Sequence, residues 1–449
     1  MTWLLSTAVL TTGLAHAGAF PYEVDHRTLD NGLEVYVVPM PTPGAVAFVT
    51  WMKVGSRDEV DEGRTGFAHF FEHLMFFGTE TLGGKARERE VLRLGVDENA
   101  WTWLDDTVYH GVVSRENLPR YVEIEADRFQ NLSLTPDDVQ KESGAVYGEF
   151  RKSQASPDNA VEVALWAEAF AEHTYGHDTI GYEADIAAMP TAHAYAMAFF
   201  DRMYRPGNAH VLVVGDVTPD EAHALVERHY GPWKPGEQER PAIPEEPPQV
   251  EERRVTVHWP TPTAERLIMA WKVPAHDPTE AEGAHLALTE DLLLSSVAPL
   301  RQRLVRDEAL AYDVSGGGLD LVDPSLFRIA VTVREGVDPA AVEGVIREEI
   351  RALSEGVEAE RLARTAEHTR YGFLSSMDDP KSVAEALGWH LRRHADPASL
   401  DTFFDHYAAA TADDVAALVA EVFVDERLTV ATLSPSGDDG PPEDEESTP

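Results

Sequence analysis

A proline-rich, acidic stretch in the middle of the 449-residue chain most constrains how the chain can fold. Residues 232–252 read PWKPGEQERPAIPEEPPQVEE, and they contain neither the period of a helix nor that of a strand. A segment of this kind is typical of a connection between domains. We therefore assign residues 236–252 to a linker, which separates a first domain over residues 18–235 from a second over residues 253–435.

Both domains are expected to combine strands with helices. Periodicity predicts strands over residues 34–39, 45–54, 101–113, 210–217, 255–258, 266–273 and 326–333, and helices over 65–77, 118–132, 136–154, 282–303 and 339–354. Each domain also closes with a helix that leads into a turn and a terminal strand, at residues 204–215 and 423–433. This faint repeat suggests a duplicated α+β unit, and the alternative is two unrelated domains that both end on a strand.

The two ends of the chain carry different signals. Residues 1–17 are apolar and end in the A-x-A cleavage site Ala15-His16-Ala17, which predicts a signal peptide and a periplasmic or secreted protein. No Lys or Arg stands near the start, so an uncleaved apolar segment is the alternative. This run is too short and too polar for a stable membrane span, and no other stretch qualifies. Residues 436–449 are acidic and rich in Pro and Gly, which predicts a disordered tail.

The composition excludes several kinds of chemistry. The chain contains no cysteine, which excludes disulfides, thiolate nucleophiles, iron–sulfur clusters and zinc sites with cysteine ligands. It has 79 acidic against 37 basic residues and a formal net charge of -42. Because polyanion binding requires a basic surface, we expect no nucleic-acid partner. Any metal ion must be held by histidines and carboxylates.

One predicted helix carries residues suited to metal chemistry. The segment GFAHFFEHLMFFG at residues 66–78 contains an H-x-x-E-H motif formed by His69, Glu72 and His73. At about 100° per residue the histidines lie ~40° apart and Glu72 lies ~60° to the other side of His69, so all three share one face. Two imidazoles one turn apart can chelate one zinc ion, and the carboxylate can take a proton from zinc-bound water. Taken alone, the motif also fits two ordinary helix histidines beside a solvated glutamate.

The neighbourhood of the motif resembles the pitrilysin family of zinc peptidases, which includes insulin-degrading enzyme and the mitochondrial processing peptidase. The resemblance covers nearly the whole mature chain and five segments in the family's order: VGSR (54–57), GFAHFFEHLMFFGT (66–79), NAWT with DTVY (99–102 and 106–109), ESGAVYGE (142–149) and YRPGN leading to VGD (204–208 and 214–216). It implies two homologous α/β-sandwich domains, each a mixed, mostly antiparallel sheet covered by helices. The first would be catalytic and the second inactive.

The resemblance also implies a set of zinc ligands that the residues alone do not identify. The family places the third ligand 76 residues after the second histidine, where this chain has Glu149. Glu142, two helical turns earlier, would orient a ligand histidine. Each chain would then bind one Zn²⁺ through His69, His73 and Glu149. Without the resemblance, Glu142 and Glu149 would be ordinary surface acids.

The implied activity is hydrolysis of peptide bonds in extended peptides or unfolded segments, with Glu72 as the general base. The family pairs its substrate with an edge strand that corresponds here to Asn99 and Ala100, and Asn99 would bond the substrate backbone. The alternative is an inner strand on which Trp101 and Trp103 only pack. Tyr312 aligns with a family tyrosine that reaches the active site, whereas Arg306 lies one residue off the expected position of its partner arginine.

The second domain contains no intact copy of the motif, so we expect no second metal site there. His173 and His177 share the spacing of a histidine pair but have no carboxylate base between them, and a turn or surface role is predicted.

The family forms its active chamber from four such domains, and this chain has two. We therefore expect a homodimer or a heterodimer with a related subunit. A non-catalytic or partner-dependent subunit is the alternative, although all four residues of the zinc site are present. An acidic chamber would favour cationic peptides, and a saline environment or an acidic proteome explains the same charge equally well.

Overall fold

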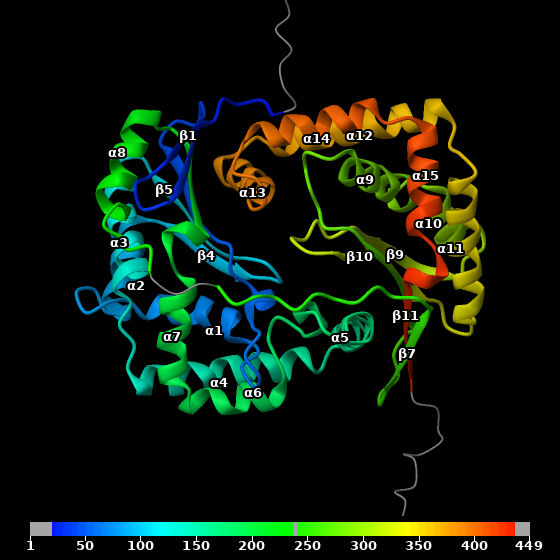
Figure 1. Ribbon diagram of the computed structural model, residues 1–449, viewed down its shortest axis with the longest axis horizontal. Coiled ribbons are helices and arrows are strands. Elements are labelled where there is room, and N and C mark those ends of the chain that lie inside the picture. Colours follow the sequence, from blue (N-terminus) through cyan, green and yellow to red (C-terminus); the bar gives the residue numbers. More distant parts are fainter. Residues whose placement is uncertain (1–19, 237–239, 436–449) are drawn as a thin grey trace, which may run out of the picture.

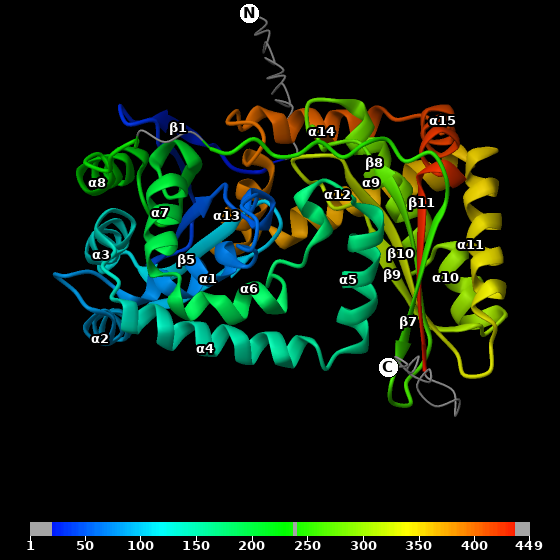
Figure 2. The ribbon, with the colours of Figure 1, turned by 60° about the horizontal axis from the view of Figure 1, so that its bottom comes forward.

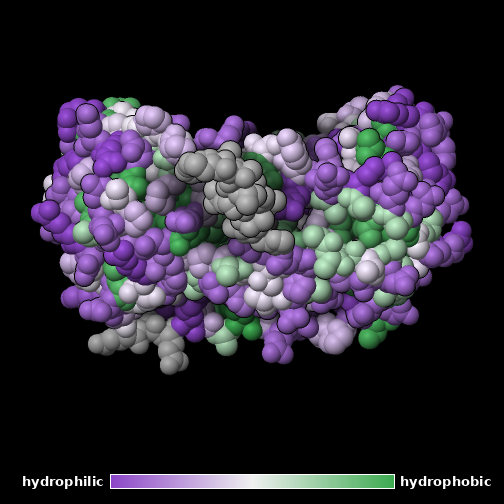
Figure 3. Space-filling model, turned by 90° about the horizontal axis from the view of Figure 1, so that it is seen from above, coloured by the Kyte–Doolittle hydropathy of each residue, from purple (hydrophilic) through white to green (hydrophobic). Residues whose placement is uncertain are grey.

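The computed structural model describes residues 20–236 and 240–435. The predicted signal peptide and the predicted tail lie outside these residues, as do positions 237–239 of the predicted linker. Residues 240–252 run between the two sheets without helix or strand. Among the described residues, none of the helices has the length and hydrophobicity that crossing a bilayer requires. Hydrophilic residues cover most of the face seen in Figure 3, in keeping with the large net charge.

The first sheet has six strands in the order β1-β2-β6-β3-β5-β4. Only β2 and β6 are parallel; every other neighbouring pair is antiparallel. The strands are β1 (Asp25–Thr28), β2 (Glu34–Pro39), β3 (Ala45–Met52), β4 (Asp97–Thr102), β5 (Thr107–Ser114) and β6 (Ala209–Gly215). The helices of this half are α1 (Phe67–Leu74), α2 (Gly84–Leu94), α3 (Leu118–Asn131), α4 (Pro136–Ser153), α5 (Pro157–Ala169), α6 (Glu183–Ala188), α7 (His193–Met203) and α8 (Pro219–Tyr230).

The second sheet repeats this topology with five strands in the order β7-β11-β8-β10-β9. Its first pair, β7 and β11, is parallel like β2 and β6, and the remaining pairs are antiparallel. The strands are β7 (Arg253–Trp259), β8 (Arg266–Val273), β9 (Ala311–Gly317), β10 (Ser325–Val333) and β11 (Leu428–Pro435). The helices are α9 (Ala281–Leu294), α10 (Pro299–Arg301), α11 (Pro339–Ser354), α12 (Ala359–Ser376), α13 (Pro380–Leu391), α14 (Ala398–Ala409) and α15 (Ala412–Val422). The predicted fold class, two mixed and mostly antiparallel sheets with helices, is confirmed.

One helix from each half packs against the sheet of the other half (Figures 1 and 2). Helix α13 packs against β3 and β6 of the first sheet, and α5 packs against β7 and β11 of the second. Leu387 of α13 is buried in the same apolar cluster as Val49 and Leu212, and Leu165 of α5 is buried with Ile268 and Leu433. The two sheets are therefore tied together by apolar cores that neither half could complete alone.

Two predicted elements are wrong in extent. The predicted strand over residues 101–113 is a hairpin, in which the Trp103 N–H donates to the Asp106 carbonyl and separates β4 from β5. The predicted helix over residues 282–303 ends at Leu294, and a new turn begins at Pro299, which has no N–H with which to continue a helix. By contrast, β2, β8 and α11 have the predicted bounds.

Candidate metal centre

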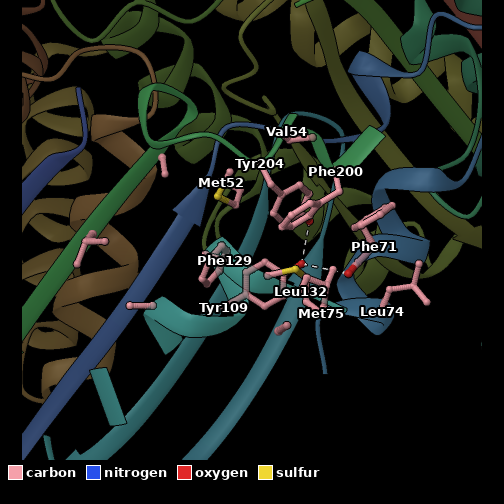
Figure 4. Packing of buried hydrophobic residues seen from close by; sticks show 14 of the residues in the cluster. Met52, Val54, Phe71, Leu74, Met75, Tyr109, Phe129, Leu132, Phe200 and Tyr204 are labelled. Atoms are coloured by element: carbon pink, nitrogen blue, oxygen red, sulfur yellow. Dashed lines mark hydrogen bonds between the residues drawn. The ribbon is translucent and has the colours of Figure 1, made fainter. Parts of the chain in front are cut away.

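Helix α1 buries its apolar side and presents the H-x-x-E-H residues on the other. Phe67, Phe70, Phe71 and Leu74 are fully buried, while His69, Glu72 and His73 are only partly covered. Figure 4 shows Phe71 beside Phe200 and Tyr204 of the core. There the Tyr109 and Tyr204 hydroxyls bond each other at 2.8 Å, and the Tyr109 hydroxyl also donates to the Phe71 carbonyl at 3.4 Å. The buried side therefore fixes how α1 turns its polar side outward.

Three potential ligand atoms meet between α1 and α4. Glu149 Oε2 lies 3.5 Å from His69 Nε2 and 3.6 Å from His73 Nε2, and no pair of the three atoms is more than 4.8 Å apart. A tetrahedral zinc ion with bonds of about 2.1 Å separates its ligand atoms by roughly 3.4 Å. These residues therefore fit a zinc ion by donor type and by spacing. No second group of this kind occurs in residues 20–236 and 240–435.

Glu142 contacts the His73 ring at Nδ1, the nitrogen that does not face Glu149. Its Oε1 lies 2.9 Å from His73 Nδ1, and when that nitrogen donates to the carboxylate, the Nε2 lone pair faces Glu149. Burial by itself lowers the pKa of His73, but the bond to Glu142 and the charge of Glu149 outweigh it, so the pKa is raised. A metal ion at this site competes with a proton for His73.

The pKa of His69 is shifted in the opposite direction to that of His73. Burial, with a further contribution from His73, lowers the pKa of His69 to about 4. His69 is therefore neutral at pH 7, with a lone pair free for a metal. Among the described residues its Nδ1 is buried without a hydrogen-bond partner, whereas Nδ1 of His73 is held by Glu142.

Glu72 lies beside these ligands and bonds to strand β4. The Thr102 hydroxyl donates to Glu72 Oε2 at 2.7 Å. Burial raises the pKa of Glu72, and the bond from Thr102 and the nearby His73 act in the opposite direction. A carboxylate with a raised pKa is a better proton acceptor near neutral pH. The sequence reasoning assigned no role to Thr102, because its contact joins residues thirty positions apart that no local pattern relates.

A cleft of about 720 Å³ opens next to Glu72 and His73. Strand β4 lies at the edge of the first sheet. Within the described residues it pairs only with β5, which agrees with the predicted edge strand rather than with an inner strand. On β4, Asn99 is exposed and Ala100 is buried. The cleft is lined by Glu72, His73, Phe76, Phe77, Gly84, Lys85, Arg87, Glu88, Glu98, Asp138, Lys141 and Glu142.

The other predicted residues lie apart from the three ligand atoms. Tyr312 on β9 is 52% exposed and lies against the Arg334 guanidinium, and Arg306 is exposed in a π-helical turn. In the part of the chain that the structure describes, no hydrogen bond or ion pair links Arg306 or Tyr312 to the ligand cluster. His173 and His177 lie in a turn as predicted, but both are buried. A surface role for them is therefore wrong, and His173 Nε2 contacts Asp323 of the second half at 2.9 Å.

Known families and structures resemble the chain over most of its length. Residues 37–183 match the model described as Insulinase (Peptidase family M16), and residues 195–368 match the model described as Peptidase M16 inactive domain. The zinc protease PqqE of Helicobacter pylori is 28% identical over 96% of this chain and 98% of its own. A crystal structure of a protease from the same organism aligns with a TM-score of 0.87 and 27% identity, over 92% of this chain and 100% of that one.

A longer protein contains a region with the same fold. The periplasmic protease PqqL from Escherichia coli aligns with 93% of this chain over 48% of its own length, with a TM-score of 0.77. At 19% identity this likeness concerns the fold alone.

Proposed function

The chain belongs to the M16 peptidase family, and from that premise we propose that it is a zinc-dependent endopeptidase. The observation that carries this proposal is the meeting of His69 Nε2, His73 Nε2 and Glu149 Oε2 at spacings of 3.5 and 3.6 Å. Two neutral nitrogens and one anionic oxygen leave a fourth position open for water or substrate, as in catalytic zinc sites. We assign catalysis to the domain over residues 18–235. We propose no metal site in the domain over residues 253–435.

Glu72 is the general base in this proposal. When zinc is bound, it supplies a Lewis acid that acidifies water and polarises the peptide carbonyl. Glu72 accepts the proton of the attacking water and delivers it to the leaving amine nitrogen. The Thr102 hydroxyl donates a hydrogen bond to Oε2 of Glu72, so Oε1 remains free to accept the proton. Glu142 keeps the proton of His73 on Nδ1, away from the ligand atom Nε2.

The substrate class follows from the free edge of β4. An extended peptide can add to this edge by main-chain hydrogen bonds, with Asn99 and Ala100 at the centre of the pairing, and such pairing tolerates many sequences. Acidic residues outnumber basic ones in the lining of the adjacent cleft, which supports a preference for cationic peptides. Cleavage of basic and acidic peptides at low and high salt tests this preference, because salt screens exposed charges.

A second copy or a related subunit completes the chamber in our proposal. The PqqL chain is about twice as long as the region that this chain matches, so one chain there has room for two such units. Arg306 and Tyr312 are exposed and have the chemistry to bind a substrate backbone from across a chamber. Export, which residues 1–17 predict, agrees with the periplasmic location in the name of PqqL.

The test combines zinc analysis with peptide cleavage. The mature wild type should hold one zinc ion per chain and cleave quenched-fluorescence peptides, while Glu72→Gln should hold zinc and lose nearly all cleavage. If the wild type binds no zinc, or if Glu72→Gln cleaves as fast as the wild type, the proposed zinc-dependent peptidase activity is refuted. A wild type that holds zinc but cleaves nothing would favour the partner-dependent subunit, whose activity should return when the partner is added.

A further inference from the structure

A buried carboxylate lies at the start of the metal-binding helix. Glu59 is only 3% exposed, and its two carboxylate oxygens each accept one backbone N–H at 2.6 Å, from Gly66 and from Ala68. The first N–H groups of a helix have no partner within the helix and need an outside acceptor. Glu59 supplies that acceptor from a loop seven residues upstream.

The local sequence cannot supply the acceptor itself. The N-cap position of α1 is Gly66, which has no side chain to accept a bond and adopts φ +83°. A Cβ at this position would lie 2.3 Å from the carbonyl oxygen of Ile180, so the usual capping residues Ser, Thr, Asp and Asn do not fit. Glu59 therefore takes over the task of an N-cap side chain.

The bond to Ala68 acts directly next to a ligand. Helix α1 has eight residues, so it comprises little more than two turns, and Ala68 immediately precedes His69. Movement of the first turn would displace His69 from Glu149, because His73 is held separately by Glu142. We propose that Glu59 is a positioning residue that keeps His69 in register with His73 and Glu149, an inference that rests on the proposed zinc site.

The surroundings of Glu59 suit such a role. His177 Nδ1 donates to the Asp178 carbonyl at 3.0 Å, which leaves its Nε2 facing Glu59 Oε2 at 3.8 Å. Burial raises the pKa of Glu59 well above its usual range, although the bonds from Ala68 and Gly66 act in the opposite direction. The two N–H groups of the helix start therefore favour the ionised form of Glu59, which burial disfavours.

The neighbouring Asp58 offers a matched control. It is equally buried, but its carboxylate accepts bonds from the Gly55 N–H and from Arg240 and makes no bond to α1. A change at Asp58 therefore disturbs the same loop without removing the cap of the helix.

The experiment compares the full-length wild type with Glu59→Gln and Asp58→Asn. Zinc affinity is measured by competition with a chromogenic chelator, folding by circular dichroism of the metal-free chains, and kcat and KM at saturating zinc. We expect Glu59→Gln to raise the zinc dissociation constant about tenfold or more, in the range seen when ligand orientation is lost. Its kcat should fall at least about tenfold while KM stays within about twofold, because Glu59 does not contact substrate. Asp58→Asn should retain the zinc affinity of the wild type.

Each other outcome counts against the proposal in a recognisable way. A folded Glu59→Gln chain with wild-type zinc affinity would overturn it and leave the zinc site standing. An equal loss in Asp58→Asn would also overturn it, because the effect would then belong to the loop. If Glu59→Gln does not fold, Glu59→Asp is tested in its place, and a second failure to fold would assign Glu59 to stability instead. A wild type without zinc would refute the zinc site itself and the proposal with it.

Discussion

The hydroxyl of Thr102 donates to Oε2 of Glu72 at 2.7 Å and thereby joins the edge strand β4 to helix α1 of the candidate metal centre. We expect β4 to pair with substrate and Glu72 to transfer the proton. The hydrogen bond from Thr102 thus fixes the position of Glu72 relative to β4. A peptide paired with β4 would be placed relative to the base by a single side-chain contact. Alignment of this kind is one of the larger contributions that a protein makes to a rate.

Replacing Thr102 tests this contact. Thr102→Val keeps the shape of the side chain and removes the donor, so Glu72 is free to rotate. We expect kcat to fall about tenfold to a hundredfold with little change in KM. Thr102→Ser keeps the hydroxyl and should retain most of the activity. If the Val variant matches the wild type in steady-state peptide cleavage, the contact has no catalytic importance.

Replacing Glu142 tests the orientation of His73. Glu142→Gln removes the charge that holds the Nδ1 proton, and the zinc dissociation constant should rise about tenfold to a hundredfold. Asp137→Asn is the control, because Asp137 lies on the same helix α4 but is exposed in its first turn. Chelator competition measures both affinities. Equal affinities in the two variants would contradict the role of Glu142.

Removal of the metal should change stability as well as activity. A ligand that binds only the folded chain stabilises it by about 2.7 kcal/mol when present at a hundred times its dissociation constant. We therefore expect a strong chelator to lower the thermal midpoint of the wild type and added zinc to restore it. His69→Ala should show no such response in differential scanning calorimetry. A response in this variant as large as that of the wild type would place the bound zinc elsewhere.

A buried charge cluster connects the two halves. Arg392, which follows α13, is 5% exposed and lies 3.2 Å from Asp106 and 4.0 Å from Asp105, in the turn between β4 and β5. Arg392→Met leaves two buried carboxylates without this partner and should lower the free energy of unfolding by about 3 kcal/mol or more. Adding Asp106→Asn should recover part of the loss. Urea denaturation of both single variants and the double variant measures the coupling, and strictly additive effects would contradict it.

Glu290 on α9 should make stability depend on pH. Burial raises the pKa of Glu290 to about 7, and the Gly318 N–H, which donates to its carboxylate, acts in the opposite direction. In an unfolded chain the pKa of a glutamate is about 4.3. Between these values the folded chain binds more protons than the unfolded one, so this group lowers the free energy of unfolding as pH rises from about 4 to 7.

Glu290→Gln removes that dependence. The variant should gain stability relative to the wild type between pH 5 and pH 8, by up to about 3 kcal/mol at the higher pH. Urea denaturation at the two pH values provides the comparison. A difference between variant and wild type that is the same at pH 5 and pH 8 would show that Glu290 does not titrate in this range.

Much of the local structure was predictable because it depends on short-range periodicity. The unbroken apolar run at 267–271 in β8 and the apolar helical spacing in α11 predicted these elements, and Asp338 caps α11 by accepting the Ala340 N–H. Prediction failed where a short turn separates two elements that follow each other closely in the chain. Asp105 and Asp106 in the hairpin of β4 and β5 and Pro299 after α9 mark both interruptions in the sequence, and the predicted elements ran across them.

The sequence by itself determined that His69, Glu72 and His73 share one helix face, because their spacing and the pitch of a helix suffice for that. The residue pattern alone does not say which of the many acids meets them; the family resemblance pointed to Glu149, and the tertiary structure brings it to the two histidines. Glu149 is 76 residues from His73, and the cap from Glu59 and the bond from Thr102 also cross between elements. The exchange of α5 and α13 between the halves is equally invisible in the sequence. Such contacts arise from the packing of whole faces, and no short-range pattern encodes which faces will meet.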